Sequence, residues 1–198
     1  MLGVLKNQID IYKLSLSSKI QCINVLLQMA LLNQNFQINI DEFKPIKLIG
    51  EGIRNQVYLV NNLSNRNNYA AKIKIVKYTT EQEYQMLFDE IKILSKVENP
   101  AILSFLGYSL KNFSQEDYPT IFTEYISNST LLQIFHLDHQ SQAPIGWSNT
   151  KKYIILLGIA LGMKYLHSLN IIHTELRPSN ILLDRKLYPH ISNFWYVK

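Results

Sequence analysis

From Phe43 onward, the hydrophobic pattern of the chain changes from helical spacing to short runs of β-branched and aromatic residues. Such runs, separated by turns rich in Asn and Ser, are typical of antiparallel strands. The expected strands cover residues 43–50, 57–61, 69–77, 102–108 and 119–125. The pattern therefore predicts a five-stranded antiparallel sheet.

One helix is expected to interrupt the strands, over residues 80–97, with Thr80 and Glu83 at the spacing of a capping box. Its apolar stripe consists of Tyr84, Leu87, Phe88, Ile91 and Leu94. Glu90 lies beside this buried stripe rather than opposite it. After the last strand the chain turns helical, over residues 131–136 and 151–169. The second of these helices is apolar almost all round, so we expect it to need burial on several sides.

The segment before the sheet has a different character. Residues 17–35 carry apolar side chains at helical spacing after serines suited to capping. We therefore place a boundary near Ile40, with an N-terminal helical extension over residues 1–40 and a second domain over residues 41–198. The fold class is α+β.

The composition and charge of the chain argue against several classes of protein. The 198 residues are 47% apolar and 18% charged, as in a globular protein with a substantial core. A net charge of +5 is scattered along the chain, so we do not expect nucleic-acid binding. No apolar run reaches the roughly 20 residues that span a bilayer, and the start does not resemble a secretion signal. We expect a cytoplasmic protein without a membrane segment, and a buried, unreactive thiol at Cys22.

Two motifs in the sheet region point to phosphate chemistry. IGEGIRNQVY places Gly50 and Gly52 between two strands, where a backbone without side chains can lie close over phosphates, although two such glycines also fit an ordinary turn. Asn55 stands where a third glycine is usual, and Asn tolerates left-handed backbone. YAAKIK places Lys72 on a strand, and Glu90 follows on the helix at a separation that lets the two side chains pair. Both lie among apolar neighbours, which favours pairing over exposure.

The stretch YLHSLNIIHTELRPSNILLD reproduces the frame of a kinase catalytic loop, H-R-D-L-x-x-x-N. The matching residues are His173, Thr174, Glu175, Leu176 and Asn180. The glycine loop, Lys72, Glu90, the hinge-like FTEYI and PHISNF occur in the order found in kinases. From Phe43 to Lys198 the chain thus resembles the protein kinase family, of the serine/threonine or tyrosine kinase-like kind. The resemblance implies a five-stranded N-lobe over residues 41–126 and the first part of a helical C-lobe over 127–198.

The resemblance also implies an ATP site. Lys72 would contact the α- and β-phosphates and Glu90 would hold it. Thr123 would be the gatekeeper, and the backbone from Glu124 to Ile126 would bind adenine. The remaining implied nucleotide contacts are Gly50, Gly52, Val57, Ala70 and Leu182, of which the last three are equally well explained as core residues. His173 would be a structural residue, stacked with Leu94 and Phe194.

Four positions depart from the family pattern. Glu175 stands where the catalytic aspartate is expected, which moves the carboxylate out by one methylene. Asn193 replaces the metal-binding aspartate, Trp195 replaces the glycine that follows, and Thr174 replaces the loop arginine. Arg177 retains a cation where the family has a lysine, and Asn180 remains as a Mg²⁺ ligand beside the weaker Asn193. We therefore expect weak or absent Mg²⁺ binding.

Three interpretations remain open from the sequence. The first is a pseudokinase that binds ATP and serves signalling by binding another protein. The second is an ATP-dependent serine/threonine kinase with residual activity, in which Glu175, Arg177 and Asn180 are catalytic. The third is a structural remnant without a ligand. The chain ends three residues after Trp195, so we expect an incomplete kinase domain with an exposed apolar surface.

Overall fold

The fold was analysed in a computed structural model of the chain, which describes residues 36–75, 81–127 and 129–193. The chain divides into two compact units, one comprising Met1–Ser95 with Leu106–Thr123 and the other Lys96–Phe105 with Glu124–Lys198. The predicted N-terminal helix, the Thr80 cap, Phe194 and Trp195 lie outside the described residues. Each unit is considered by itself.

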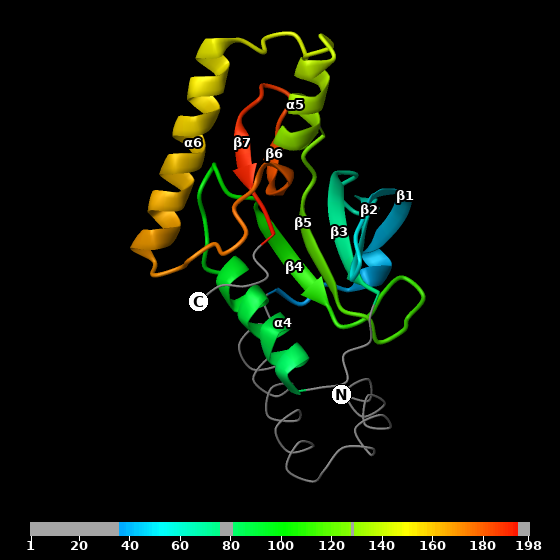
Figure 1. Ribbon diagram of the computed structural model, residues 1–198. Coiled ribbons are helices and arrows are strands. Elements are labelled where there is room, and N and C mark those ends of the chain that lie inside the picture. Colours follow the sequence, from blue (N-terminus) through cyan, green and yellow to red (C-terminus); the bar gives the residue numbers. More distant parts are fainter. Residues whose placement is uncertain (1–35, 76–80, 128, 194–198) are drawn as a thin grey trace. The chain divides into compact units, whose positions relative to one another are not determined.

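The first unit is built on a five-stranded antiparallel sheet in the order β1-β2-β3-β5-β4 (Figure 1). Its strands are β1 (Phe43–Glu51), β2 (Asn55–Asn62), β3 (Asn68–Lys74), β4 (Phe105–Ser109) and β5 (Thr120–Glu124). A short 3-10 helix, η2 (Ile40–Glu42), leads into β1. The predicted five-stranded antiparallel sheet is therefore confirmed.

Side chains alternate between the two faces of this sheet, because successive residues of a strand point in opposite directions. Val60 pairs with Tyr69, and Tyr58 pairs with Ala71. This face carries the core cluster of Ile40, Phe43, Val60, Ala71 and Phe122, in which the rings of Phe43 and Phe122 lie 4.7 Å apart. Val57 pairs with Lys72 and therefore belongs to the other face.

Helix α4 (Glu81–Leu94) lies beside the sheet (Figure 1). It buries Leu87, Phe88, Ile91 and Leu94, as the apolar stripe predicted. Glu90 is buried with them at 3% exposure, in agreement with its predicted place next to the stripe.

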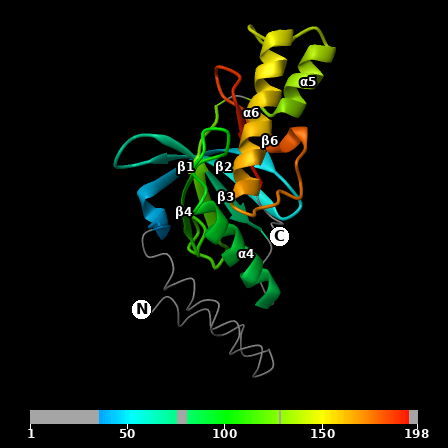
Figure 2. The same ribbon diagram turned by 90° about the vertical axis from the view of Figure 1, so that its left-hand side faces the viewer.

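The second unit contains α5 (Leu131–His139), α6 (Asn149–Ser168), η3 (Pro178–Asn180), β6 (Ile181–Leu183) and β7 (Pro189–Ile191). Strands β6 and β7 pair as a hairpin, which lies between α5 and α6 (Figure 1). Figure 2 shows the two helices next to each other, seen from the side. Two glycines of α6 permit a close approach to this hairpin. A Cβ at Gly158 would lie 2.6 Å from Pro189, and one at Gly162 would lie 2.8 Å from Ile191.

Some predicted bounds were wrong. The strand expected over residues 102–108 begins only at Phe105, because the backbone of Leu103 donates to Ile191 and that of Ile191 donates to Ala101. The preceding segment is thereby bound to β7. Strand β3 ends at Lys74, before the predicted end at residue 77, and α4 ends at Leu94 rather than at residue 97.

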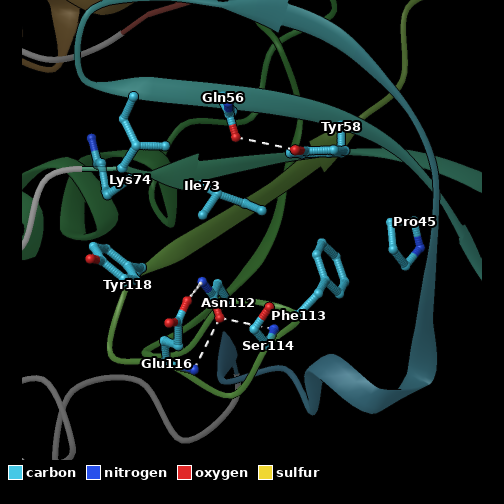
Figure 3. A pocket seen from close by; sticks show the side chains of 11 residues that line it. Pro45, Gln56, Tyr58, Ile73, Lys74, Asn112, Phe113, Ser114, Glu116 and Tyr118 are labelled. Carbon is cyan, nitrogen blue, oxygen red and sulfur yellow. Dashed lines mark hydrogen bonds between the residues drawn. The ribbon is translucent and has the colours of Figure 1, made fainter.

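A cavity of about 410 Å³ opens beside β2 and β3, where Gln56, Tyr58, Ile73 and Lys74 line it (Figure 3). The loop between β4 and β5 forms one of its walls. Asn112 shapes this loop: its Oδ1 accepts from the backbone of Ser114 and Glu116, and its Nδ2 donates to the Glu116 carboxylate. The lining of the cavity combines apolar side chains, such as Ile73 and Phe113, with polar ones, such as Gln56 and Glu116.

Helix α6 exposes much of its apolar surface. Tyr153 is 73% exposed, Leu156 62%, Leu157 60% and Leu161 53%. Ile155, between these residues, is 2% exposed. The expectation of an exposed apolar surface is therefore confirmed for this helix. Among the helices that the structure describes, none is long and apolar enough to cross a membrane.

The contrast between Leu157 and Ile155 gives a test of α6. We expect Leu157→Gln to reduce self-association and change the free energy of unfolding by less than about 0.5 kcal/mol, because its side chain is already in water. Ile155 lies on the same helix but is buried. Ile155→Gln should lower the free energy of unfolding by about 2 kcal/mol or more, because it buries an amide in a packed core. Urea unfolding and light scattering measure both. Equal effects of the two substitutions would contradict this placement.

Candidate functional site

The candidate site of the first unit lies on the sheet face that carries Lys72. Strand β3 places Lys72 toward α4, and its Nζ lies 3.1 Å from Oε1 of Glu90. Lys72 keeps 20% of its side chain exposed, whereas that of Glu90 is 2% exposed. The structure thus brings together the two residues that the sequence predicted to pair, with the lysine partly accessible and its partner buried.

Lys74 is a second lysine at this carboxylate, and sequence reasoning missed it. Its Nζ lies 3.5 Å from Oε2 of Glu90, and its side chain is 1% exposed. The signal was present in YAAKIK, because the two-residue period of a strand puts positions 72 and 74 on one face. Burial lowers the pKa of Lys74 to about 6, although the charge of Glu90 opposes this shift. One buried carboxylate therefore serves two amines.

The glycine loop joins β1 to β2, with Gly50 opposite Val57 and the backbone of Gly52 donating to Asn55. The positive-φ residues of the described chain do not include Gly50, Gly52 or Asn55, so Asn55 does not adopt the left-handed conformation that asparagine tolerates. A Cβ at Gly50 would make ordinary contact with Val57 at 3.6 Å, and one at Gly52 would lie 3.8 Å from Asn55. Neither glycine is required by the fold of the loop itself.

Three further predicted nucleotide contacts lie in the same unit. Val57 and Ala70 share the sheet face of Lys72, because Val57 pairs with Lys72 and Ala70 lies two residues before it. Both are half-buried. Thr123 is half-buried near the end of β5.

The second unit contains the predicted hinge, Glu124 to Ile126. The Glu124 backbone N–H donates to Ser104, and its Oε1 accepts from the backbone of Ser104 at 2.8 Å. His190 Nδ1 lies 3.4 Å from the same carboxylate. Burial alone would raise the pKa of Glu124, but hydrogen bonds from His190 and Ser104 outweigh burial and hold it below its usual value. The Glu124 side chain is therefore engaged within its own unit. Leu182 and Ile126 are half-buried.

The loop with the catalytic-loop motif brings Glu175 and Asn193 into direct contact. Asn193 Nδ2 donates to Oε2 of Glu175 at 3.0 Å. Arg177 lies 3.9 Å from the same oxygen, with 61% of its side chain exposed. Asn193 has a φ of 72°, a left-handed conformation that Asn tolerates better than most residues. An aspartate at 193 would place two carboxylates against each other, so the two departures from the family pattern are complementary.

Asn180 and His173 hold this loop from inside. Asn180 is buried, and its Nδ2 donates to the backbone oxygen of Glu175 at 2.8 Å, which leaves Oδ1 as the atom the side chain could offer to a metal. His173 Nδ1 accepts from the backbone of Glu175 at 3.3 Å, while Nε2 lies 2.9 Å from the carbonyl of Ser192. Because Nδ1 accepts, Nε2 carries the proton and donates. His173 is therefore placed as a structural residue, as predicted.

The chain is similar to known proteins. The family model described as "Protein kinase domain" matches residues 43–198. A protein named "Probably inactive leucine-rich repeat receptor-like protein kinase" from Arabidopsis thaliana is 36% identical over 149 residues, covering 74% of this chain and 14% of the relative. The serine/threonine-protein kinase TNNI3K of Mus musculus is 31% identical over 178 residues, covering 86% of this chain and 20% of the relative.

A third relative, the dual specificity protein kinase pyk3 of Dictyostelium discoideum, is 28% identical over 158 residues, covering 80% of this chain and 11% of the relative. The chain therefore spans less than a quarter of the length of each of these three relatives. The family match and the paired Lys72 and Glu90 show that the chain belongs to the protein kinase family.

The Glu175–Asn193 contact gives a test of the candidate site in the second unit. We expect Asn193→Asp to destabilise the chain by about 1 kcal/mol at neutral pH, because a carboxylate replaces the donor and solvent screens part of the repulsion. Mg²⁺ should restore stability in the variant more than in the parent chain, since two carboxylates suit a hard cation. Thermal unfolding with and without Mg²⁺ measures this.

Asn170→Asp is the matched control, because Asn170 is exposed and also has a positive φ, of 58°. It should show no Mg²⁺ effect. An Asn193→Asp chain as stable as its parent without Mg²⁺ would contradict the contact.

Proposed function

We propose that the chain is a pseudokinase domain that binds ATP and acts in signalling as a binding platform for another protein, with phosphoryl transfer weak or absent. The observation that carries this proposal is the hydrogen bond between Asn193 and Glu175, at 3.0 Å. It joins the residue at the metal-ligand position to the residue at the catalytic-base position. Kinases need negative charge at the first and a precisely placed carboxylate at the second.

The nucleotide-binding part of the proposal rests mainly on Lys72 and Glu90. Lys72 would contact the phosphates, with Glu90 as its buried counter-ion, and the backbone at Gly50 and Gly52 would lie over them. Because a Cβ fits at both glycines without a clash, close approach of a ligand is the better explanation for these residues. By resemblance to the family, Val57, Ala70 and Leu182 would contact the adenine, and Thr123 would be the gatekeeper. The backbone from Glu124 to Ile126 would hydrogen-bond the adenine.

Weak catalysis is expected from two features: the neutral side chains at the metal positions and the longer side chain of Glu175. Bound Mg²⁺ would bridge the phosphates, and Asn180 and Asn193 could offer it only neutral oxygens. Glu175 keeps a negative charge, but displacement of a catalytic group by about 1 Å costs on the order of a hundredfold in rate. The relative from Arabidopsis thaliana that is named "Probably inactive" supports this reading by its name alone.

A serine/threonine kinase with residual activity is the second candidate. The buried and anchored Asn180 favours it, because this side chain is the metal ligand that the family pattern retains. Arg177 and Glu175 would then act on the phosphate and the acceptor hydroxyl. A chain that binds no nucleotide would be the structural remnant.

Thermal unfolding with ATP tests nucleotide binding. ATP at a hundred times its dissociation constant should add roughly 2.7 kcal/mol to the free energy of unfolding. Lys72→Met should abolish this gain. Gly52→Ala should weaken it while leaving the unliganded chain at least as stable, because the added methyl group meets no clash and reduces the entropy of the unfolded chain. No stabilisation by ATP in the parent chain would sink the proposal in favour of the remnant.

A transfer assay with labelled ATP separates the two kinase candidates. The pseudokinase account expects no transfer, or transfer far below the ordinary range of about 1 to 100 per second. Transfer within that range, lost in Lys72→Met, would show an active kinase instead.

A further inference from the structure

Lys74 differs from Lys72 in how much of its side chain is exposed to solvent. Both leave β3 on the same face and both approach Glu90, but Lys72 is 20% exposed and Lys74 is 1% exposed. Lys72 takes Oε1 of the carboxylate and Lys74 takes Oε2. Each oxygen of Glu90 thus has its own amine.

A fully buried lysine is costly unless it makes a compensating interaction, since its amine loses the hydrogen bonds of water. At this place an apolar side chain of similar length would pack without that cost. The lysine therefore has an effect that packing alone does not explain, and its amine points at the carboxylate on which Lys72 depends.

We propose that Lys74 is a positioning residue for the Lys72–Glu90 pair: it holds the carboxylate oxygen that Lys72 leaves, so that the two lysines share one anion. A carboxylate fixed at both oxygens cannot rotate away with α4 as freely as one held at a single oxygen. The charge state of Lys74 then acts on Lys72 through Glu90.

The electrostatics of Lys74 support this coupling. Burial lowers its pKa to about 6, with Glu90 on α4 raising it, and Lys72 on β3 and Arg54 before β2 lowering it. At neutral pH the Lys74 amine is therefore mainly uncharged and donates a hydrogen bond to Glu90, which leaves the negative charge to Lys72. Below pH 6 it becomes a second cation at the same carboxylate.

The sign of the stability effect follows from these values. Between about 6 and the ordinary lysine pKa of 10.5, the unfolded chain binds a proton at Lys74 that the folded chain does not. Lys74 therefore makes stability rise with pH across this window. Lys74→Met should remove that part of the rise.

Lysine labelled with ¹³C at Cε, followed by NMR from roughly pH 5 to 8, tests the proposal on the full chain without any nucleotide. We expect one lysine signal, absent in Lys74→Met, to titrate near pH 6. The Lys72 signal, identified by its loss in Lys72→Met, should shift with the same midpoint. In Lys74→Met the Lys72 signal should lose this inflection, and in the exposed control Lys47→Met both titrations should persist.

A Lys72 signal that does not change through the Lys74 midpoint would overturn the proposal, and the parent chain alone decides this even if Lys74→Met fails to fold. A Lys74 signal without a midpoint near 6 would overturn it too. The link to nucleotide rests on the proposed function. If ATP binds, its Kd is measured for Lys74→Met and for the parent chain at pH 7.5 and at pH 5.5. The ratio of the Kd of Lys74→Met to that of the parent chain should be at least about threefold higher at pH 5.5. A constant ratio would overturn the coupling, whereas absence of ATP binding would contradict only the proposed function.

Discussion

The buried carboxylate of Glu90 is the interaction on which the first unit's site depends. It lies on α4 among Leu87, Phe88 and Ile91, and it joins the helix to β3 through Lys72 at 3.1 Å. Removing one partner of a buried ion pair leaves an uncompensated charge and typically costs 3–5 kcal/mol or so. Lys74, at the other oxygen, makes this carboxylate the meeting point of three ionisable groups. The Lys72–Glu90 pair thus links α4 to β3 and is also the candidate phosphate-binding group.

In the second unit, the residues at the expected catalytic and metal-binding positions differ from the family pattern. Where the family places two acidic residues with metal and substrate between them, Glu175 and Asn193 contact each other directly. The amide removes the repulsion that a second carboxylate would create, and the longer Glu175 side chain reaches it. His173 and Asn180 keep the surrounding backbone in place through Ser192 and Glu175. The backbone around Glu175 is thus held by hydrogen bonds, and position 193 carries an amide instead of a carboxylate.

Much of this was predictable from the sequence, because strand alternation and helix periodicity are local signals. The five strands, the stripe of α4 and the Lys72–Glu90 pair follow from them. The late start of β4 was missed because Leu103 bonds to Ile191, which lies far along the chain, and no local pattern encodes such a bond. The hairpin of β6 and β7 was missed because each of its strands has only three residues, which is too short for a clear alternating pattern. Lys74 was missed because a lysine in a strand is ordinarily exposed. The Glu175–Asn193 bond needed the positive φ of Asn193, which the sequence does not display.

Calorimetric titration of ATP into the chain, with Mg²⁺ and with a chelator, tests the central claim most directly. If Lys72 and Glu90 bind the phosphates while Asn180 and Asn193 offer the metal no anion, ATP should bind in both conditions, with dissociation constants that differ by less than roughly tenfold, or 1.4 kcal/mol. Binding that requires Mg²⁺ would contradict the account, because Asn180 and Asn193 would then hold the metal as well as an acidic site does.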